Sequence, residues 1–208
     1  MTAPRRALIL VDVQNEYFSG PLEIQYPPRE QALAAIIDAI TIAGENTIPV
    51  AAIRHELPEG APIFAAGSPG AELHPDIAAL AQPEWQHTSK VFASVFDDTD
   101  LETWIRAHDI DTITLVGFMT NNCIIGSAVG AESLGLKVEV LSDATGAIAI
   151  ANEAGSVDAK TLHTTLLAVL HSNLAAVTDT DGWRLAVADK TAVQPSNLIE
   201  SALAGRGN

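Results

Sequence analysis

The sequence has little of several residue types, and each shortage excludes some classes of function. Among its 208 residues there is one cysteine, so an intrachain disulfide framework and a cysteine-rich zinc site are both excluded. Basic residues number 11 against 26 acidic ones, which gives a net charge of −15. Because such a surface repels phosphate groups, we expect no nucleic acid partner and no binding to anionic membranes.

Long apolar runs are also missing, and none approaches the length of a membrane span. The stretch 7–13 after Arg5 and Arg6 is too short for a signal peptide, ends near Asp12 and lacks a small-residue cleavage site. A single cysteine is compatible with a reducing compartment. We therefore expect a soluble, cytoplasmic protein.

Short β-branched runs alternate with helical periodicity along the chain, which predicts an α/β fold. Strands that are apolar on both faces and separated by helices indicate a parallel sheet covered on both sides. We predict one domain over residues 1–208, with a core at about 6–178, an extension at 179–208, and a three-layer α/β/α, Rossmann-like arrangement around a six-stranded parallel sheet. The expected strands are 7–13, 48–53, 112–116, 138–141 and 175–177, with a weaker one near 87–91.

Side chains that could bind a ligand or take part in catalysis follow several of these strands. Ligands in such sheets bind outside the carboxyl ends of the strands, where the strand order reverses. Asp12, Arg54, His55, Lys90 and Cys123 stand at those ends. A glycine-rich turn is missing after the first strand, which argues against nucleotide binding. The irregular segment 56–86, rich in proline, glycine and alanine, is typical of a binding loop or lid.

Cys123 allows two interpretations. At a strand-to-helix turn, unpaired backbone N–H groups and the helix dipole would stabilise a thiolate, which is the setting of a nucleophile. A lone cysteine among apolar residues is also a common inert core residue. The segment around Cys123 does not decide between these alternatives.

Three motifs taken together resemble a known family. The chain resembles the isochorismatase-like cysteine hydrolases, which include nicotinamidases, N-carbamoylsarcosine amidase, biuret and ureidoacrylate amidohydrolases, and isochorismatase itself. The similarity covers residues 6–178 in collinear order. The motifs are Asp12-Val13-Gln14-Asn15, Lys90 with the aromatic segment 92–96, and Gly117-Phe118-Met119-Thr120-Asn121-Asn122-Cys123.

The resemblance implies a catalytic triad of Asp12, Lys90 and Cys123. Asp12 would take the thiol proton and later give it to the leaving amine, while Lys90 balances the charge of the site. It also implies an oxyanion hole formed by the backbone N–H groups of Met119 and Cys123, with a cis peptide between Phe118 and Met119 orienting the first donor.

Four further residues are expected to bind the substrate: Tyr17, Arg54, His55 and Gln14. The metal site of nicotinamidases is not expected here, because Arg54 replaces a ligating carboxylate and leaves His55 and His74 as a poor ligand set. We predict no metal and no cofactor. His163 and His171 are expected to be packing or surface residues.

The resemblance further implies a homo-oligomer, either a dimer or a tetramer. The apolar stretch 197–204 could pack on a neighbouring subunit or cover its own core. The expected activity is hydrolysis of a C–N bond in a small amide or carbamoyl compound through a thioester on Cys123. Two alternatives stay open, an isochorismatase-type vinyl ether hydrolase and a catalytically silent binding module of the same fold.

Overall fold

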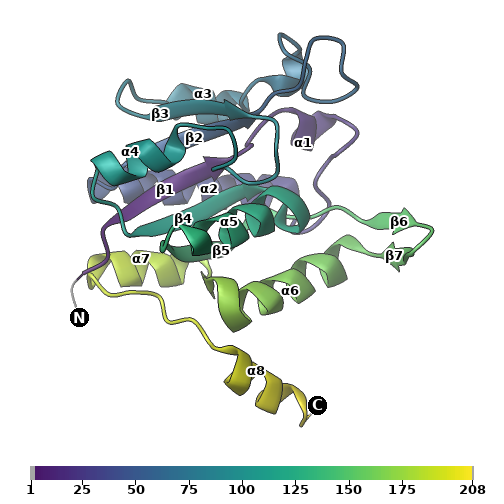
Figure 1. Ribbon diagram of the computed structural model, residues 1–208. Helices are drawn as coiled ribbons and strands as arrows, with labels where there is room; N and C mark the ends of the chain where they lie inside the picture. The colour runs from purple at the N-terminus through teal and green to yellow at the C-terminus, as the bar shows by residue number, and fades with distance from the viewer. Residues whose placement is uncertain (1–2, 208) are drawn as a thin grey trace.

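A six-stranded parallel sheet forms the centre of the computed structural model, which describes residues 3–207 (Figure 1). The strand order is β3-β2-β1-β4-β5-β8, so the direction of winding reverses between β1 and β4. This confirms the predicted three-layer fold. The strands are β1 (Arg6–Val11), β2 (Val50–His55), β3 (Gln86–Lys90), β4 (Thr112–Phe118), β5 (Lys137–Gly146) and β8 (Ala176–Thr178).

Alternating apolar side chains on the strands feed two separate cores. On β1, Leu8 and Leu10 belong to one core, while Ala7, Ile9 and Val11 belong to the other, as the two-residue period of a strand requires. The first core is covered by α1 (Glu16–Ser19), α2 (Arg29–Glu45), α3 (Pro75–Leu80) and α7 (Thr180–Ala188). The second is covered by α4 (Leu101–Ala107), α5 (Ile125–Ser133), and α6 (Ala159–Val169) with its continuation η3 (Leu170–Leu174).

Other parts of the chain are more ordered than the sequence predicted. The segment 56–86 contains the short 3-10 helix η1 (Pro69–Ala71) as well as α3. A small antiparallel hairpin, β6 (Ile150–Asn152) and β7 (Gly155–Val157), projects from the body (Figure 1). The expected extension after residue 178 begins with α7, whose Trp183 is fully buried in the core. It ends with α8 (Leu198–Gly205).

A buried ion pair ties β1 to β5 near the start of both strands. The Arg6 guanidinium donates from Nε and Nη2 to the two carboxylate oxygens of Glu139, at 2.9 and 2.8 Å. Glu139 also accepts hydrogen bonds from the Thr114 hydroxyl and the Trp183 indole. Because buried charges need such partners, this network fixes the packing of α7 on the sheet.

None of the helices within residues 3–207 combines the length and the apolar character needed to cross a membrane.

Candidate active site

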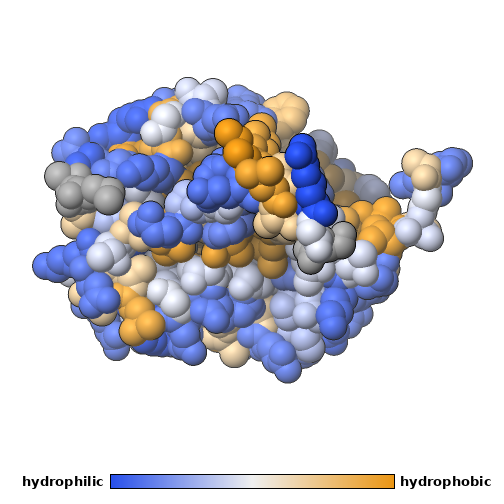
Figure 2. All heavy atoms as spheres, turned by 90° about the horizontal axis from the view of Figure 1, so that it is seen from below, coloured by the Kyte–Doolittle hydropathy of each residue, from blue (hydrophilic) through white to orange (hydrophobic). Residues whose placement is uncertain are grey.

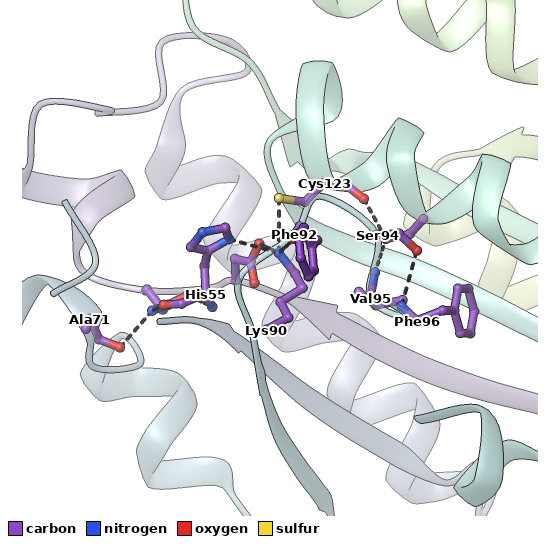
Figure 3. Close-up of polar contacts among 11 residues, drawn as sticks. His55, Ala71, Lys90, Phe92, Ser94, Val95, Phe96 and Cys123 are labelled. Carbon is purple, nitrogen blue, oxygen red and sulfur yellow. Dashed lines mark hydrogen bonds and ion pairs between the residues drawn. The ribbon is translucent and has the colours of Figure 1, made fainter. Parts of the chain in front are cut away.

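Asp12, Lys90 and Cys123 meet at one buried point. The Lys90 ammonium Nζ lies 2.7 Å from Asp12 Oδ2 and 3.2 Å from Cys123 Sγ. It also lies 3.2 Å from His55 Nδ1 and donates to the carbonyl oxygen of Phe92 at 3.1 Å (Figure 3). The three triad residues are each at most 3% exposed. One cation therefore bridges a carboxylate and a thiol in a site shielded from bulk water.

The sheet topology brings these residues together. Asp12 follows β1 and Cys123 follows β4, so the two flank the point where the strand order reverses. Lys90 is the last residue of β3 and pairs in register with His55 on β2. Cys123 lies in η2 (Thr120–Ile124), a π-helical turn leading into α5, and turns of this kind are frequent at functional sites.

Backbone geometry at the end of β4 requires a glycine beside Asp12. Gly117 has φ +108, and a Cβ at this position would lie 2.0 Å from the carbonyl oxygen of Val11. Only glycine therefore lets β4 approach β1 this closely. Asp12 itself has φ +52, in the left-handed region that aspartate tolerates better than most residues. The peptide bond between Phe118 and Met119 is cis.

Burial and neighbouring charges set the protonation states. Burial, followed by the Asp12 charge, raises the pKa of the Cys123 thiol to about 12. For Lys90, burial acts to lower the pKa, but the charges of Asp12 and Cys123 and hydrogen bonds to both residues outweigh it, and the pKa is raised. Burial and then the Lys90 charge lower the pKa of His55. At neutral pH the site holds a charged lysine, a neutral histidine and a protonated thiol.

These states bear on one of the two interpretations of Cys123. A thiolate stabilised by the helix dipole was one possibility, but desolvation of a nearly fully buried sulfur and the adjacent Asp12 act in the opposite direction, and the pKa of the thiol is raised. The Cys123 thiol therefore keeps its proton at neutral pH.

Two of the four expected substrate-binding residues lie at the triad. His55 contacts Lys90, and its ring packs 5.1 Å from that of Phe64. Tyr17 is buried, and its ring lies 5.3 Å from Phe64. Burial, with Asp12 and Cys123 charges contributing, raises the pKa of Tyr17, so its hydroxyl is neutral.

The other two expected contacts take different roles. Gln14 is fully buried, and its side-chain amide exchanges hydrogen bonds with backbone groups of His55 and also donates to Ala71, which ties β2 to the 56–86 segment. Arg54 precedes His55 on β2, so its side chain leaves the opposite face of the strand. It forms ion pairs with Glu56 and Glu72, both at 3.6 Å. We therefore place neither Gln14 nor Arg54 in direct contact with the substrate.

A metal ion fits this cluster poorly. Asp12, His55 and Cys123 could offer ligand atoms within 4.8 Å of one another. The Lys90 ammonium, however, lies within 3.2 Å of an atom from each of them, so a positive charge already occupies the space between the donors. His74 is used elsewhere, since its Nδ1 accepts a hydrogen bond from the backbone N–H of Asp76 at the start of α3.

Three residues near the site were not predicted from the sequence to belong to it. Phe64 comes from the 56–86 segment, where composition gave no signal for any single position. Phe92 is 52% exposed and belongs to the aromatic segment 92–96, which the sequence motif placed directly after Lys90 without giving this residue a role. His163 is buried, in agreement with the expectation that it packs or lies on the surface, and its Nδ1 lies 2.9 Å from the hydroxyl of Thr120, in the turn that carries Cys123. Its Nε2 lies 3.1 Å from the carbonyl oxygen of Ser142.

Comparison with known proteins gives consistent matches along most of the chain. A family model described as the isochorismatase domain matches residues 6–182. A crystal structure from Burkholderia xenovorans LB400, described as a presumed isochorismatase, is 41% identical with a TM-score of 0.96, covering 99% of this chain and 98% of that one. A cysteine hydrolase from Pseudomonas syringae pv. phaseolicola 1448A is 26% identical with a TM-score of 0.81, covering 89% and 93%. The nicotinamidase of Escherichia coli K12 is 27% identical over 67% of this chain and 82% of its own length.

Proposed function

Because the chain belongs to the isochorismatase family of hydrolases, we propose that it cleaves the C–N bond of a small amide or carbamoyl compound through a thioester on Cys123. The observation that supports this activity is the position of Lys90 Nζ, 2.7 Å from Asp12 Oδ2 and 3.2 Å from Cys123 Sγ. A carboxylate, a cation and a thiol in mutual contact are the groups that nucleophilic attack on an amide requires. The match to a cysteine hydrolase and to a nicotinamidase agrees with this assignment.

In this mechanism the Cys123 proton moves to Asp12 as the sulfur attacks the substrate carbonyl. A concerted transfer suits a thiol whose pKa is raised to about 12, because a free thiolate would be too rare to react at neutral pH. Lys90 stays charged and stabilises the negative charge that passes from Asp12 to sulfur. The backbone N–H groups of Met119 and Cys123 are the proposed donors to the developing oxyanion.

Collapse of the tetrahedral intermediate breaks the C–N bond, and Asp12 returns its proton to the leaving amine. A water molecule then attacks the thioester, with Asp12 again accepting a proton, and the acid product leaves with the thiol restored. Each proton taken from sulfur or water is thereby delivered to the amine or back to the thiol. No oxidant, reductant or cofactor enters this sequence.

The aromatic side chains beside the triad are suited to hold a flat acyl group. Phe64 packs on both Tyr17 and His55, and Phe92 offers an exposed ring at the edge of the site (Figure 3). Neutral His55 accepts from the Lys90 ammonium through Nδ1, which leaves Nε2–H as a donor. These groups bind a small planar carbonyl compound better than an extended polymer.

Acid quench during turnover tests the proposal. Wild-type protein incubated with a panel of small amides and carbamoyl compounds should yield a mass increment on the peptide containing Cys123 equal to the acyl fragment, and hydroxylamine should release it. The Cys123→Ala variant should give neither adduct nor ammonia. Ammonia release by that variant at the wild-type rate would disprove the thioester route.

A second candidate activity is the vinyl ether hydrolysis that gives the family its name. It is favoured by one observation, namely that Asp12 sits next to a thiol that stays protonated and so is not required to change state. In this reaction Asp12 acts as the acid and no bond forms to sulfur. Pyruvate release from isochorismate by the Cys123→Ala variant, together with no trapped adduct from any amide, would establish this alternative.

A further inference from the structure

His163 is a buried titratable group that the proposed mechanism does not use. It belongs to α6, which lies on the lower side of the molecule in Figure 1, the side that Figure 2 shows from below with α8 as an apolar ridge. The next two residues of the helix, Thr164 and Thr165, are exposed, whereas His163 is 2% exposed and packs edge-to-face with the ring of Tyr26 at 5.6 Å. The imidazole therefore faces the interior of the protein.

Both ring nitrogens of His163 contact polar groups of other elements. Nδ1 lies 2.9 Å from the hydroxyl of Thr120, the first residue of η2, and Nε2 lies 3.1 Å from the carbonyl oxygen of Ser142 on β5. A register shift between Leu115 and Gly117 interrupts the ladder between β4 and β5, and Ser142 lies in the interruption. One side chain therefore ties η2 to a part of β5 that is not paired with β4.

The hydrogen bonds of His163 have a defined direction. Burial lowers the pKa of His163, although its hydrogen bond to Ser142 acts in the opposite direction, so the ring is neutral at pH 7 and carries one proton. The carbonyl oxygen of Ser142 can only accept, so that proton is on Nε2. Nδ1 then has a free lone pair and accepts from the Thr120 hydroxyl. His163 is thus held as the Nε2–H tautomer.

The Thr120 hydroxyl is held from two sides. Besides Nδ1 of His163, it has the carbonyl oxygen of Gly146 as an acceptor at 3.1 Å. Gly146 pairs with Phe118 in the ladder of β4 with β5, so this contact ties the turn only to a strand that β4 already holds. Thr120 is fully buried, and bulk water does not compete for either contact. His163 is therefore the link that fixes the hydroxyl against α6.

Thr120 stands between the two backbone groups that are the proposed oxyanion donors, those of Met119 and Cys123. The carbonyl oxygen of Met119 accepts from the N–H groups of Asn122 and Ile124, both at 3.1 Å, so the turn is closed by its own backbone. A displacement of Thr120 would consequently move the whole turn, including the sulfur. A misplacement of reacting groups by about 1 Å can cost about 10²-fold in rate.

We propose that His163 is a positioning residue, which holds the Thr120 hydroxyl and thereby keeps the turn from Met119 to Cys123 in the geometry that attack on the substrate requires. This inference rests on the proposed function, because it assigns the turn to catalysis. His163 acts through Thr120 and takes no part in the proton transfers. Supporting hydrogen bonds of this kind are what hold a catalytic group in its productive position.

Turnover by matched variants tests the role in catalysis. His163→Phe keeps an aromatic ring without its nitrogens, His163→Gln keeps one donor and one acceptor, and Thr120→Val removes the hydroxyl at similar volume. With an amide that wild type hydrolyses, His163→Phe and Thr120→Val should each lower kcat by about 10–100-fold with little change in KM. His163→Gln should restore most of that loss. The double variant should be no slower than the slower single variant, because both changes break one link.

Alkylation of Cys123 tests the position of the turn without any substrate. At pH 8, iodoacetamide should label Cys123 several-fold faster in His163→Phe and Thr120→Val than in wild type, because a displaced turn buries the sulfur less and its pKa falls. His171→Leu is the matched control, since His171 also accepts a hydrogen bond through Nδ1, from the Val177 N–H at 3.0 Å, but lies in η3. Its labelling rate and kcat should match wild type, with urea denaturation reporting the stability of each variant.

The two measurements separate this inference from the proposed function. Faster labelling in both variants supports the role of His163 in holding the turn even if no amide is hydrolysed, a result that would count against the thioester route alone. Wild-type kcat or wild-type labelling in His163→Phe would overturn the inference, and so would losses that His171→Leu shares or that His163→Gln does not restore. If His163→Phe fails to fold, Thr120→Val decides, and wild-type behaviour of that variant overturns the inference.

Discussion

Replacing Asp12 with asparagine is expected to make Cys123 more reactive toward an alkylating agent while removing enzymatic turnover. The pKa of the thiol is raised to about 12 by burial and then by the Asp12 charge, with Lys90 acting in the opposite direction. Asp12→Asn removes the second of these causes and leaves Lys90 in place 3.2 Å from the sulfur. The pKa of Cys123 should therefore fall, although burial still holds it above the ordinary value.

The size of the effect follows from the thiolate fraction. With a pKa of about 12, roughly one thiol in ten thousand is ionised at pH 8, about three orders of magnitude less than for free cysteine. Each unit by which the pKa falls raises the alkylation rate about tenfold. Amide hydrolysis should meanwhile fall by roughly 10²–10⁴, because asparagine cannot carry a proton.

Iodoacetamide labelling followed by intact mass gives the rate, measured between pH 7 and 10 on wild type, Asp12→Asn and the exposed control Asp76→Asn. Because the folded pKa is raised, the wild-type rate should still be climbing at pH 10, where free cysteine has reached its plateau. The control should follow wild type. A wild-type plateau near pH 7, or a slower Asp12→Asn reaction at every pH, would refute the protonation states assigned to this site.

Three further predictions concern the scaffold and the metal. Gly117→Ala should destabilise the protein by several kcal/mol or prevent folding, since its Cβ would lie 2.0 Å from the Val11 carbonyl oxygen, and urea denaturation measures the loss. Arg6→Met should cost about 3–5 kcal/mol by leaving the buried Glu139 charge without its partner, whereas Arg184→Met, which breaks an exposed pair, should cost far less in the same denaturation assay. Hydrolytic activity should survive prolonged chelation, and loss that added metal restores would contradict the assignment of the Lys90 site.

Much of the fold could be predicted from the sequence because its strands are apolar on both faces. Runs such as Ile113–Val116 do not show the regular alternation of apolar and polar residues that a strand with one solvent-exposed face would have. Segments with helical periodicity separate these runs, and a parallel sheet is the usual arrangement of such strands. The β6–β7 hairpin could not be predicted, because each of its strands has only three residues. The burial of α7 depends on Trp183 reaching Glu139, a partner 44 positions away.

The expectation that ligands bind outside the carboxyl ends of the strands selected residues that do meet in the structure, but it could not separate His55 from Arg54. Adjacent residues on a strand point to opposite faces, so a shift of one residue in the expected register would exchange their roles. The register that pairs His55 with Lys90 exists only in the folded sheet. The position of His163 was even harder to predict, because its contact with Thr120 joins α6 to the turn that carries Cys123 across 43 positions of sequence.

Protonation states depend on three-dimensional burial, and for that reason the sequence could not decide the state of the Cys123 thiol. A cysteine at the start of a helix has the same local sequence whether the sulfur is exposed or buried, and only exposure lets the helix dipole determine the pKa. Here burial raises the pKa of the thiol, and in the proposed mechanism Asp12 accepts its proton. In the proposed mechanism, a substrate carbonyl that draws the sulfur forward triggers ionisation and attack in one step, and a thiol with so high a pKa should resist oxidation until the substrate binds.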